Sequence, residues 1–351
     1  MNQNRYLIHS GAALLDALAR LNSLSGGPMT LFVTDEAGRV TGSLTDGDVR
    51  RALLAGMPLD CPVDRAARRD FSYISTDHPD VELLRECRRK GLRLLPELRP
   101  DGTLSRIVNL DRTTNLLPLS AVLMAGGKGE RLRPLTLNTP KPLLQIEGKA
   151  IIDYNIEALA AVGIDRITVT TRYLAEQLDR HFSAPVAGVQ VHTVREEQPL
   201  GTIGAVSLID LPDDGDTLVM NSDILTTISF EDLYIRHRES GADVTIAAIP
   251  YQVSVPFAIL STEGERVTGL QEKPTYAYFA NAGIYIFRNS ILRSISRDTP
   301  TDAPDLIARV IDEGGHVGYF PVNGTWLDVG TPADFAQAAE LMRHHKNFSR
   351  R

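Results

Sequence analysis

The stretch that decides the fold is Leu123-Met-Ala-Gly-Gly-Lys-Gly-Glu-Arg-Leu-Arg-Pro-Leu-Thr-Leu-Asn-Thr-Pro-Lys-Pro-Leu-Leu144. It starts within an apolar run at residues 121–124 and becomes a loop with three glycines and four cationic side chains, namely Gly126, Gly127, Gly129, Lys128, Arg131, Arg133 and Lys141. Glycines after a buried strand let backbone N–H groups approach a phosphate closely, and cations add charge. The loop is not a P-loop, because no Gly-Lys-Ser/Thr ends it. It is not a dinucleotide fingerprint, because Leu132 replaces the third glycine.

Strands and helices alternate after this loop. Apolar spacing predicts helices at 150–162, 173–182, 204–208 and 230–240, and strands at 166–171, 189–194 and 217–221. Such a βαβ rhythm predicts a mostly parallel sheet in a three-layer α/β fold. Ligands bind these sheets at the carboxyl ends of the strands, and the glycine loop is at such an end.

The glycine stretch closely resembles the signature of the sugar-1-phosphate nucleotidyltransferases, which make nucleoside-diphosphate sugars. The resemblance extends over about residues 119–339 and implies a Rossmann-like domain of the GT-A-like type. It implies that Arg131 and Lys141 neutralise the triphosphate and its leaving pyrophosphate. It also implies a loop that wraps the nucleotide phosphates, formed by Ala125, Gly126, Gly127 and Gly129.

Two aspartates are candidates for binding Mg²⁺. Asp223 follows the apolar strand at 217–220, and Asp328 lies in Trp326-Leu-Asp-Val-Gly-Thr331, just before a C-terminal helix. An isolated aspartate at such a place is as often a helix cap. Both match the family's metal-binding aspartates, however, and Mg²⁺ prefers one or two carboxylates together with substrate phosphates.

Three further segments resemble substrate-binding segments of the family. The segment Glu196-Glu-Gln-Pro-Leu-Gly-Thr-Ile-Gly204 resembles the base-recognition loop, with Gln198 on the base edge, Gly201 allowing close approach and Thr202 beginning a helix. In Gln271-Glu-Lys-Pro274 the resemblance implies that Glu272 contacts sugar hydroxyls and that Lys273 binds the sugar phosphate. In Asn281-Ala-Gly-Ile-Tyr285 it implies that Asn281 and Gly283 line the sugar site.

The implied reaction joins two anions. A sugar-1-phosphate oxygen attacks the α-phosphorus of an NTP, and pyrophosphate leaves. The second phosphate pKa is about 6, so the nucleophile is already anionic near neutral pH and no general base is required. This agrees with motifs that contain no histidine. The obstacle is charge repulsion, which Mg²⁺, Lys273, Arg131 and backbone amides would offset.

Composition sets the broad class. The chain has 351 residues and a net charge of −7, which argues against general nucleic-acid binding. Its two cysteines, Cys61 and Cys87, fit a reducing compartment without disulfides. The N-terminus lacks the apolar core of a signal peptide, and no apolar run is long enough to span a membrane. We therefore expect a cytoplasmic protein that binds neither nucleic acid nor membrane.

Residues 1–115 contain two related halves. The first predicts a helix at 11–24, strands at 30–34 and 40–44 and a helix at 46–55, and the second weakly repeats this order with a helix at 80–90 and strands at 93–98 and 104–110. The segment Gly42-Ser-Leu-Thr-Asp-Gly-Asp-Val-Arg-Arg51 resembles the end of a CBS motif, so this part is similar to a smaller α+β CBS-domain pair. The resemblance implies that Thr45 and Asp48 contact an adenine nucleotide. Residues 105–112 lack the Thr-x-x-Asp spacing, and nucleotide sensing and simple dimerisation both stay open.

We therefore predict a CBS pair at 1–115 and a catalytic domain at 116–351, with a linker at 113–120. This order resembles bacterial CBS-containing glucosamine-1-phosphate guanylyltransferases of surface glycan or nonulosonic acid synthesis, which implies GTP and a hexosamine-1-phosphate. The alternatives are a mannose-1-phosphate guanylyltransferase, a glucose-1-phosphate thymidylyltransferase and a non-catalytic nucleotide-sensing regulatory protein. The matched set of Arg131, Lys141, Asp223, Lys273 and Asp328 favours an enzyme. We also expect a homo-oligomer, and no left-handed β-helix after the catalytic domain.

Overall fold

The computed structural model describes residues 3–76, 81–111, 116–297 and 299–348. The chain forms two compact units, which are Met1–Leu117 with Ala161–Gly163 (unit 1) and Pro118–Ala160 with Ile164–Arg351 (unit 2). The predicted linker at 113–120 lies partly outside the described residues, since 112–115 are among those left out. Its last two residues already belong to strand β7 (Leu119–Ala125), so the prediction extended the linker too far.

The first half of unit 1 is a three-stranded sheet with two helices. Strand β1 (Leu7–His9) pairs in parallel with β2 (Thr30–Thr34), and β2 pairs antiparallel with β3 (Val40–Thr45). Helix α1 (Leu14–Ser23) buries Leu14, Ala17 and Leu21, which share one helical face. Helix α2 (Asp46–Leu54) follows β3 directly. One 3₁₀ turn (Gln3–Tyr6) precedes β1 along the chain, and another (Val63–Arg65) follows α2.

The second half of unit 1 repeats the strand pairing of the first. Strand β4 (Ile74–Ser75) pairs in parallel with β5 (Leu94–Leu98), and β5 pairs antiparallel with β6 (Leu104–Asn109). Helix α3 (Val81–Arg89) connects β4 to β5, and the predicted helix start at Asp80 lies outside the described residues. The predicted internal repeat is therefore confirmed at the level of strand order and direction.

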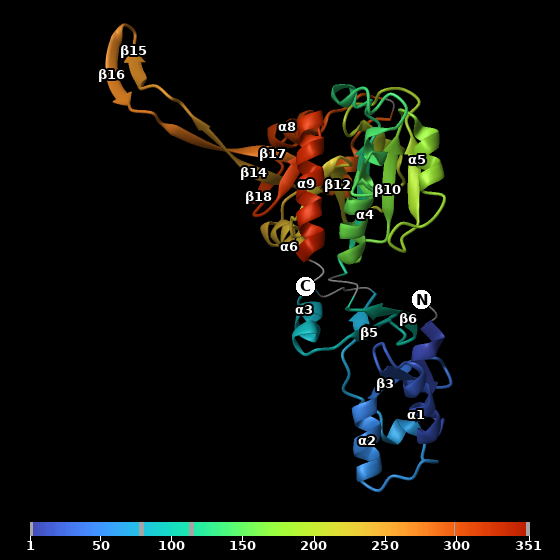
Figure 1. Ribbon diagram of the computed structural model, residues 1–351. Helices are drawn as coiled ribbons and strands as arrows, with labels where there is room; N and C mark the ends of the chain where they lie inside the picture. Colours follow the sequence, from blue (N-terminus) through green and yellow to red (C-terminus); the bar gives the residue numbers. More distant parts are fainter. Residues whose placement is uncertain (1–2, 77–80, 112–115, 298, 349–351) are drawn as a thin grey trace. The chain divides into compact units, whose positions relative to one another are not determined.

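Unit 2 is built on a seven-stranded sheet (Figure 1). Its strands, in sheet order, are β11 (Val191–Arg195), β10 (Ile167–Thr171), β7, β12 (Asp216–Asn221), β17 (Thr275–Arg288), β14 (Val244–Ser254) and β18 (Val317–Pro321). Strand β17 runs antiparallel to both β12 and β14, and the other neighbours pair in parallel. This confirms the mostly parallel sheet.

Helices and short turns cover this sheet. The helices are α4 (Ile151–Ala161), α5 (Ala175–His181), α6 (Phe230–Ser240), α7 (Asn289–Arg293), α8 (Ala303–Asp312) and α9 (Pro332–Phe348), and the 3₁₀ segments are η3 (Glu130–Leu132), η4 (Lys141–Leu143) and η5 (Gly204–Leu208). Side chains from η5, α7 and α8 pack with Val122, Val219 and Phe287 of the sheet into one apolar core. Within the described residues, no helix is long and apolar enough to cross a membrane.

Two small strand pairs lie beside the main sheet. Strand β8 (Gln145–Ile146) pairs with β9 (Lys149–Ala150), and β13 (Ile224–Thr226) pairs antiparallel with β19 (Trp326–Asp328). The second pair joins two segments that are about a hundred residues apart, as in the hydrogen bond that the Thr226 hydroxyl donates to the Thr325 carbonyl.

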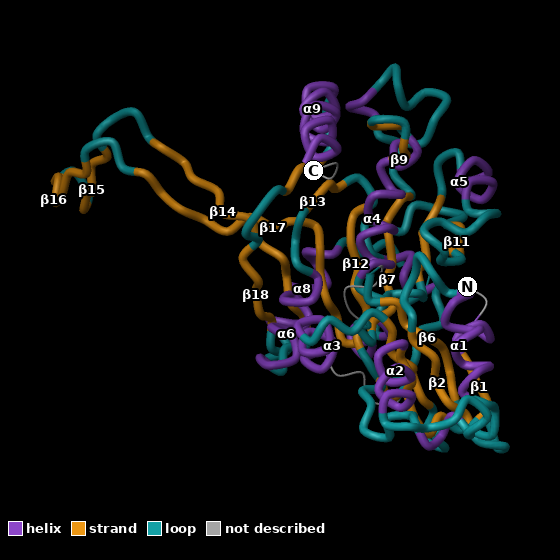
Figure 2. The backbone as a smooth tube through the Cα atoms, turned by 60° about the horizontal axis from the view of Figure 1, so that its bottom comes forward, coloured by secondary structure: helices purple, strands orange, loops and turns teal. Residues whose placement is uncertain are grey.

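A long hairpin extends beyond the sheet and was not predicted. Strands β14 and β17 stay paired as far as Ser254 and Thr275, and β15 (Ile259–Glu263) and β16 (Arg266–Gln271) pair at the far end. We call residues 249–280 the arm. Figures 1 and 2 both show the arm running clear of the rest of unit 2.

Candidate active site

A cavity of about 590 Å³ lies at the carboxyl ends of the parallel strands. Met124 and Ala125 at the end of β7, Thr170 in β10 and Asn221 at the end of β12 all line it, together with the glycine loop. Open α/β sheets bind ligands at this edge because the strands end there and loops of several crossovers converge. No histidine is among the described lining residues.

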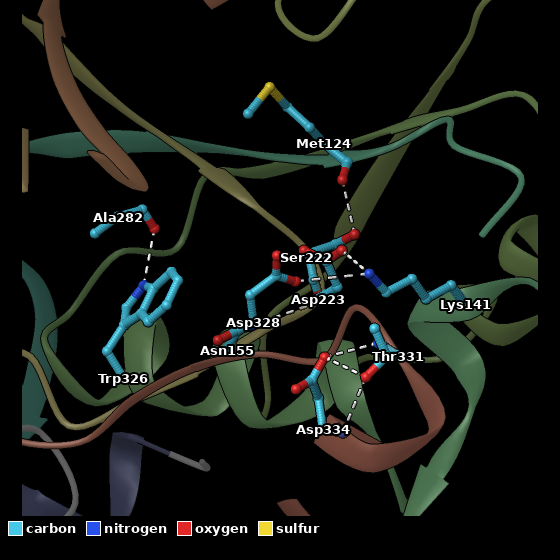
Figure 3. A network of polar contacts seen from close by, with 10 residues as sticks. All are labelled: Met124, Lys141, Asn155, Ser222, Asp223, Ala282, Trp326, Asp328, Thr331 and Asp334. Carbon is cyan, nitrogen blue, oxygen red and sulfur yellow. Dashed lines mark hydrogen bonds and ion pairs between the residues drawn. The ribbon is translucent and has the colours of Figure 1, made fainter. Parts of the chain in front are cut away.

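Lys141 is the central cation of this cavity. Its ammonium donates a hydrogen bond to Oδ2 of Asp223 and lies 3.7 Å from Oδ1 of Asp328. The Lys141 side chain is only 14% exposed, so its charge is poorly screened by water. Figure 3 shows both carboxylates facing the end of this lysine.

Backbone pairing brings the two aspartates together. Ile224 pairs with Asp328 in the β13–β19 ladder, and the Val329 amide donates to the Asp223 carbonyl at 3.1 Å. The segment is fixed further by the Ser222 hydroxyl, which donates to the Met124 carbonyl at 2.7 Å at the end of β7. The position of Asp223 is therefore set by both the main sheet and the small strand pair (Figure 3).

The electrostatics of this pair suit a cation. Burial, and then the charge of Asp223, raise the pKa of Asp328, while Lys141 and Arg131 oppose the shift. Oδ1 of Asp223 and Oδ1 of Asp328 are buried and have no hydrogen-bond partner within the described part of the chain. Unpaired buried carboxylate oxygens are costly unless a cation or donor meets them. In the described ranges no group of three or more His, Cys, Asp or Glu could hold a metal, so the chain offers two oxygen donors and phosphates would supply others. Asp223 and Asp328 are therefore suited to hold Mg²⁺ together with substrate phosphates.

The glycine loop has the close packing that its sequence requires. Gly129 has a φ of +60°, and a Cβ there would lie 3.0 Å from Thr136 and 3.1 Å from Lys141. A Cβ on Gly126 would lie 2.5 Å from Oε1 of Glu196. Gly127 has open space around it, which leaves the backbone at that point accessible to a ligand. Arg131 follows in η3 and lines the cavity.

Glu196 and Arg172 are two cavity residues to which the sequence analysis gave no role. Glu196 follows β11, is 6% exposed and accepts a hydrogen bond from the Leu200 amide at 3.3 Å. Burial raises the pKa of this carboxyl, although the Leu200 amide and the charge of Arg172 oppose the shift. Arg172 Nε lies 3.9 Å from Glu196 and has no hydrogen-bond partner among the residues described. Each residue follows the carboxyl end of a strand, and that position was the available signal.

In the predicted base-recognition loop, Thr202 bonds to the start of α8 and does not begin a helix of its own. Thr202 does not begin a helix, since η5 begins at Gly204. Instead its hydroxyl accepts from the Ala303 amide at 2.8 Å, at the start of α8, and its amide donates to Asp302. Gly201 has a φ of +76°, and a Cβ there would lie 2.5 Å from the Thr301 carbonyl. Gly201 and Thr202 line the cavity, whereas Gln198 is exposed and is not among the lining residues.

The two predicted sugar-binding segments lie in different places. Gly283 is close to the cavity, because a Cβ there would lie 2.6 Å from the Asn221 side chain. The Asn281 side chain accepts from the Gly283 amide and donates to the Tyr285 hydroxyl, each at 2.9 Å. Glu272 and Lys273 are exposed at the base of the terminal hairpin of the arm, after β16, and they are not among the lining residues. The structure therefore does not bring them to the cavity of their own chain, because β14 and β17 stay paired beyond the sheet.

In unit 1, Thr45 and Asp48 contact each other. Thr45 caps α2, and Asp48 accepts from the Thr45 amide at 2.9 Å, which completes a capping box. Asp48 is 5% exposed and also pairs with Arg51 and with Arg68, the latter at 2.7 Å. Burial raises the pKa of Asp48, but hydrogen bonds from Thr45 and the two arginines outweigh it, so the pKa is lowered. A nucleotide contact at these residues stays a prediction.

Comparison with known proteins gives the family. The chain is 33% identical over 226 residues to a mannose-1-phosphate guanylyltransferase catalytic subunit beta of Danio rerio, with 62% of each chain covered. It is 33% identical over 228 residues to a mannose-1-phosphate guanyltransferase of Gibberella zeae, again with 62% of each covered. The match thus spans less than two thirds of these curated relatives. The crystal structure of HddC from Yersinia pseudotuberculosis has the same fold, with a TM-score of 0.50, 24% identity, and coverage of 64% of this chain and 99% of that one. The sequence pattern of the nucleotidyl transferase family matches residues 120–345, and the chain belongs to that family.

Proposed function

We propose that unit 2 transfers a nucleotidyl group from an NTP to a sugar-1-phosphate and releases pyrophosphate. The observation that carries this proposal is the cluster of Lys141, Asp223 and Asp328 beside a glycine loop at the carboxyl edge of the sheet. Such a cluster combines cationic charge, accessible backbone and carboxylates, which is what a site for two phosphorylated substrates and a metal ion requires.

The proposed reaction needs charge compensation more than proton transfer. An anionic oxygen of the sugar-1-phosphate forms a bond to the α-phosphorus, and the bond to pyrophosphate breaks. Since the nucleophile is ionised near neutral pH, a cavity whose described lining contains no histidine is adequate. Lys141, Arg131 and the loop amides would hold the phosphates together and stabilise the charge on the leaving group.

Asp223 and Asp328 are the residues that would hold Mg²⁺. When bound, the ion would neutralise phosphate charge and favour departure of pyrophosphate. Support comes from the buried Oδ1 atoms of both carboxylates, which have no hydrogen-bond partner among the residues described. Lys141 adds a fixed positive charge at the same point of the cavity.

For the substrates we propose GTP and mannose-1-phosphate. The two curated relatives reported above are named mannose-1-phosphate guanylyltransferases, and they favour this alternative over the glucosamine-1-phosphate specificity that the domain order indicated. The glucosamine enzyme remains the competitor. A matrix of GTP, ATP, CTP, UTP and dTTP against mannose-, glucosamine- and glucose-1-phosphate, with pyrophosphate release as readout, tests both. Absence of pyrophosphate release for every pair of substrates would favour a non-catalytic nucleotide-sensing regulatory protein instead.

Unit 1 is proposed to be a CBS-domain pair with a nucleotide site at Thr45 and Asp48. Support comes from the matching strand order of its two halves and from the position of Thr45 at the junction of β3 and α2. Regulation would need a nucleotide that binds two states of the enzyme with different affinity.

A further inference from the structure

The arm has two unlike faces. Tyr251 pairs with Tyr278, and Val253 pairs with Tyr276, so these four side chains share one face of the ribbon. Tyr251 and Tyr278 are each 57% exposed. The opposite face carries the pairs Gln252–Ala277 and Ser254–Thr275, which are small or polar. Nearer the sheet it also carries Pro250–Phe279, where the Phe279 ring packs against Tyr319 of β18 with ring centroids 4.9 Å apart.

The terminal hairpin of the arm is also apolar and exposed. Leu260 pairs with Leu270 across β15 and β16, and they are 53% and 62% exposed. Phe257, in the connection to this hairpin, is 73% exposed. A two-stranded ribbon is marginally stable by itself in water, and a contiguous exposed apolar patch usually marks an interaction surface. The arm therefore needs a surface to cover its aromatic face.

The direction of the arm relates it to the cavity. Strand β14 is antiparallel to β17, which is antiparallel to β12, so β14 leaves the sheet at the same edge as the cavity. From Ala248, the last residue of β14 to pair with β18, to Ser254 the ribbon extends about 20 Å past that edge. Lys273 lies just beyond the Ser254–Thr275 pair and is exposed.

We propose that two copies of this chain exchange arms, so that the Gln271–Pro274 turn of each copy enters the cavity of the other. The role of Lys273 at a sugar phosphate rests on the function proposed above. Each arm would bury its aromatic face against the partner. Reciprocal exchange closes a two-fold dimer in which both cavities are completed.

A second copy fits the arm better than an unrelated protein does. The turn carries Glu272 and Lys273, which match the sugar-phosphate residues of this family, and the cavity that would use them is on the same chain but out of their reach. Under this proposal, the cavity lacks the sugar-phosphate residues that the arm carries, and the arm lacks the cavity in which they would act. An exposed face of tyrosines is also typical of the core of a protein interface.

Complementation between two impaired variants, assayed at a sugar-1-phosphate concentration near the wild-type KM, tests the exchange. Asp223→Asn disables the cavity and leaves the arm intact, whereas Lys273→Ala disables the arm and leaves the cavity intact. The two full-length chains are given different affinity tags, co-expressed and purified as the heterodimer. With exchange, one of the two sites in each heterodimer is complete, and pyrophosphate release should reach about half of the wild-type rate. A heterodimer no more active than either homodimeric variant, beside an active wild type, would mean that each arm serves its own chain and would overturn the proposal.

A second measurement is independent of activity, so it separates failure of the exchange from failure of the proposed function. Sedimentation velocity is run on the full chain and on Tyr251→Ser with Tyr278→Ser. We expect the dimer dissociation constant to rise by at least about tenfold, because buried aromatic anchors dominate such interfaces. The matched control is Gln252→Ser with Ala277→Ser on the opposite face, which should leave the constant unchanged. A monomeric wild type, or equal constants in all three proteins, would overturn the proposal even if the enzyme is active.

Discussion

Lys141 donates a hydrogen bond to Asp223 across 82 residues of sequence. The pair joins the end of the glycine stretch to the residues that follow β12, and Oδ1 of Asp328 lies 3.7 Å from the same ammonium of Lys141. A cation and two carboxylates are therefore held together before any substrate binds. Such preorganisation is an effective way to stabilise developing charge in phosphate chemistry.

The first prediction concerns the two aspartates. Asp223→Ala and Asp328→Ala should each lower kcat by more than about 10²-fold, because one preorganised electrostatic group typically contributes that much. Steady-state kinetics of pyrophosphate release measure this, with circular dichroism to verify folding. The matched control is Asp334→Ala, which removes a carboxylate near the site that accepts from Thr331. It should lose about 1 kcal/mol of stability through the lost cap and keep its kcat.

The second prediction separates the two substrates. Arg131 lines the cavity, so under the proposed function Arg131→Ala should impair NTP use and pyrophosphate departure. Lys273→Ala should raise the KM for the sugar-1-phosphate far more than that for the NTP. Two-substrate kinetics distinguish these effects. If both variants changed only the KM for the NTP, the assignment of Lys273 would be wrong.

The third prediction compares two glycines of the cavity. Gly201→Ala should destabilise unit 2 by about 1–3 kcal/mol, because its φ is +76° and a Cβ would meet the Thr301 carbonyl. Gly127→Ala should be close to neutral for stability, since no atom of the described residues lies within 4 Å of its Cβ position. Thermal unfolding of the two variants tests the difference. Equal melting temperatures would contradict the close packing of the 199–204 loop against residues 299–303.

The fourth prediction concerns the pH dependence of stability. Burial raises the pKa of Glu196 above its ordinary value of 4.5, so the folded state binds this proton more tightly than the unfolded state. The contribution of Glu196 to stability is then greatest below pH 4.5 and is lost as the pH rises through the folded pKa. The glutamine in Glu196→Gln does not titrate. The melting temperature of this variant should therefore rise relative to that of the wild type as the pH is raised from 4 to 7. A constant difference across this range would argue against a raised pKa.

The fifth prediction concerns unit 1. The full chain should bind one adenine or guanine nucleotide in addition to the one in the cavity, and Thr45→Val should remove this extra equivalent. Thr41→Val, in the same strand, removes a hydroxyl that donates to the Val33 carbonyl at 3.3 Å and serves as the control. Equilibrium dialysis gives the stoichiometry. A single equivalent in every variant would leave dimerisation as the role of the module.

Local sequence patterns were sufficient to predict most of the helices and strands. Helix α6 and strand β2 have the bounds that were predicted, since strong periodicity and clear end signals specify them. The glycine loop was also placed correctly at the carboxyl end of β7. Pairing over long distances was harder to predict, because no local pattern shows that Ile224 lies opposite Asp328. The two aspartates could be placed together only through the resemblance.

The arm shows a second limit of sequence reasoning. Residues 249–254 alternate as a half-exposed strand should, although Tyr278 and Phe279 interrupt the alternation in 275–280. Alternation does not tell whether a ribbon folds over its own sheet or extends from it. The sugar-phosphate role of Lys273 was implied by the resemblance alone, which carries no information about the direction of the arm. Glu196 shows a third limit, since only the folded packing reveals that its carboxyl lies against Gly126.

The central claim is tested most directly by pyrophosphate release from GTP and mannose-1-phosphate with Mg²⁺, compared with every other donor and acceptor pair and with the Asp223→Ala variant. We expect release that requires both substrates, is fastest with this pair and falls by more than about 10²-fold in the variant. Absence of release for all pairs, or release that is unaffected by Asp223→Ala, would contradict the account.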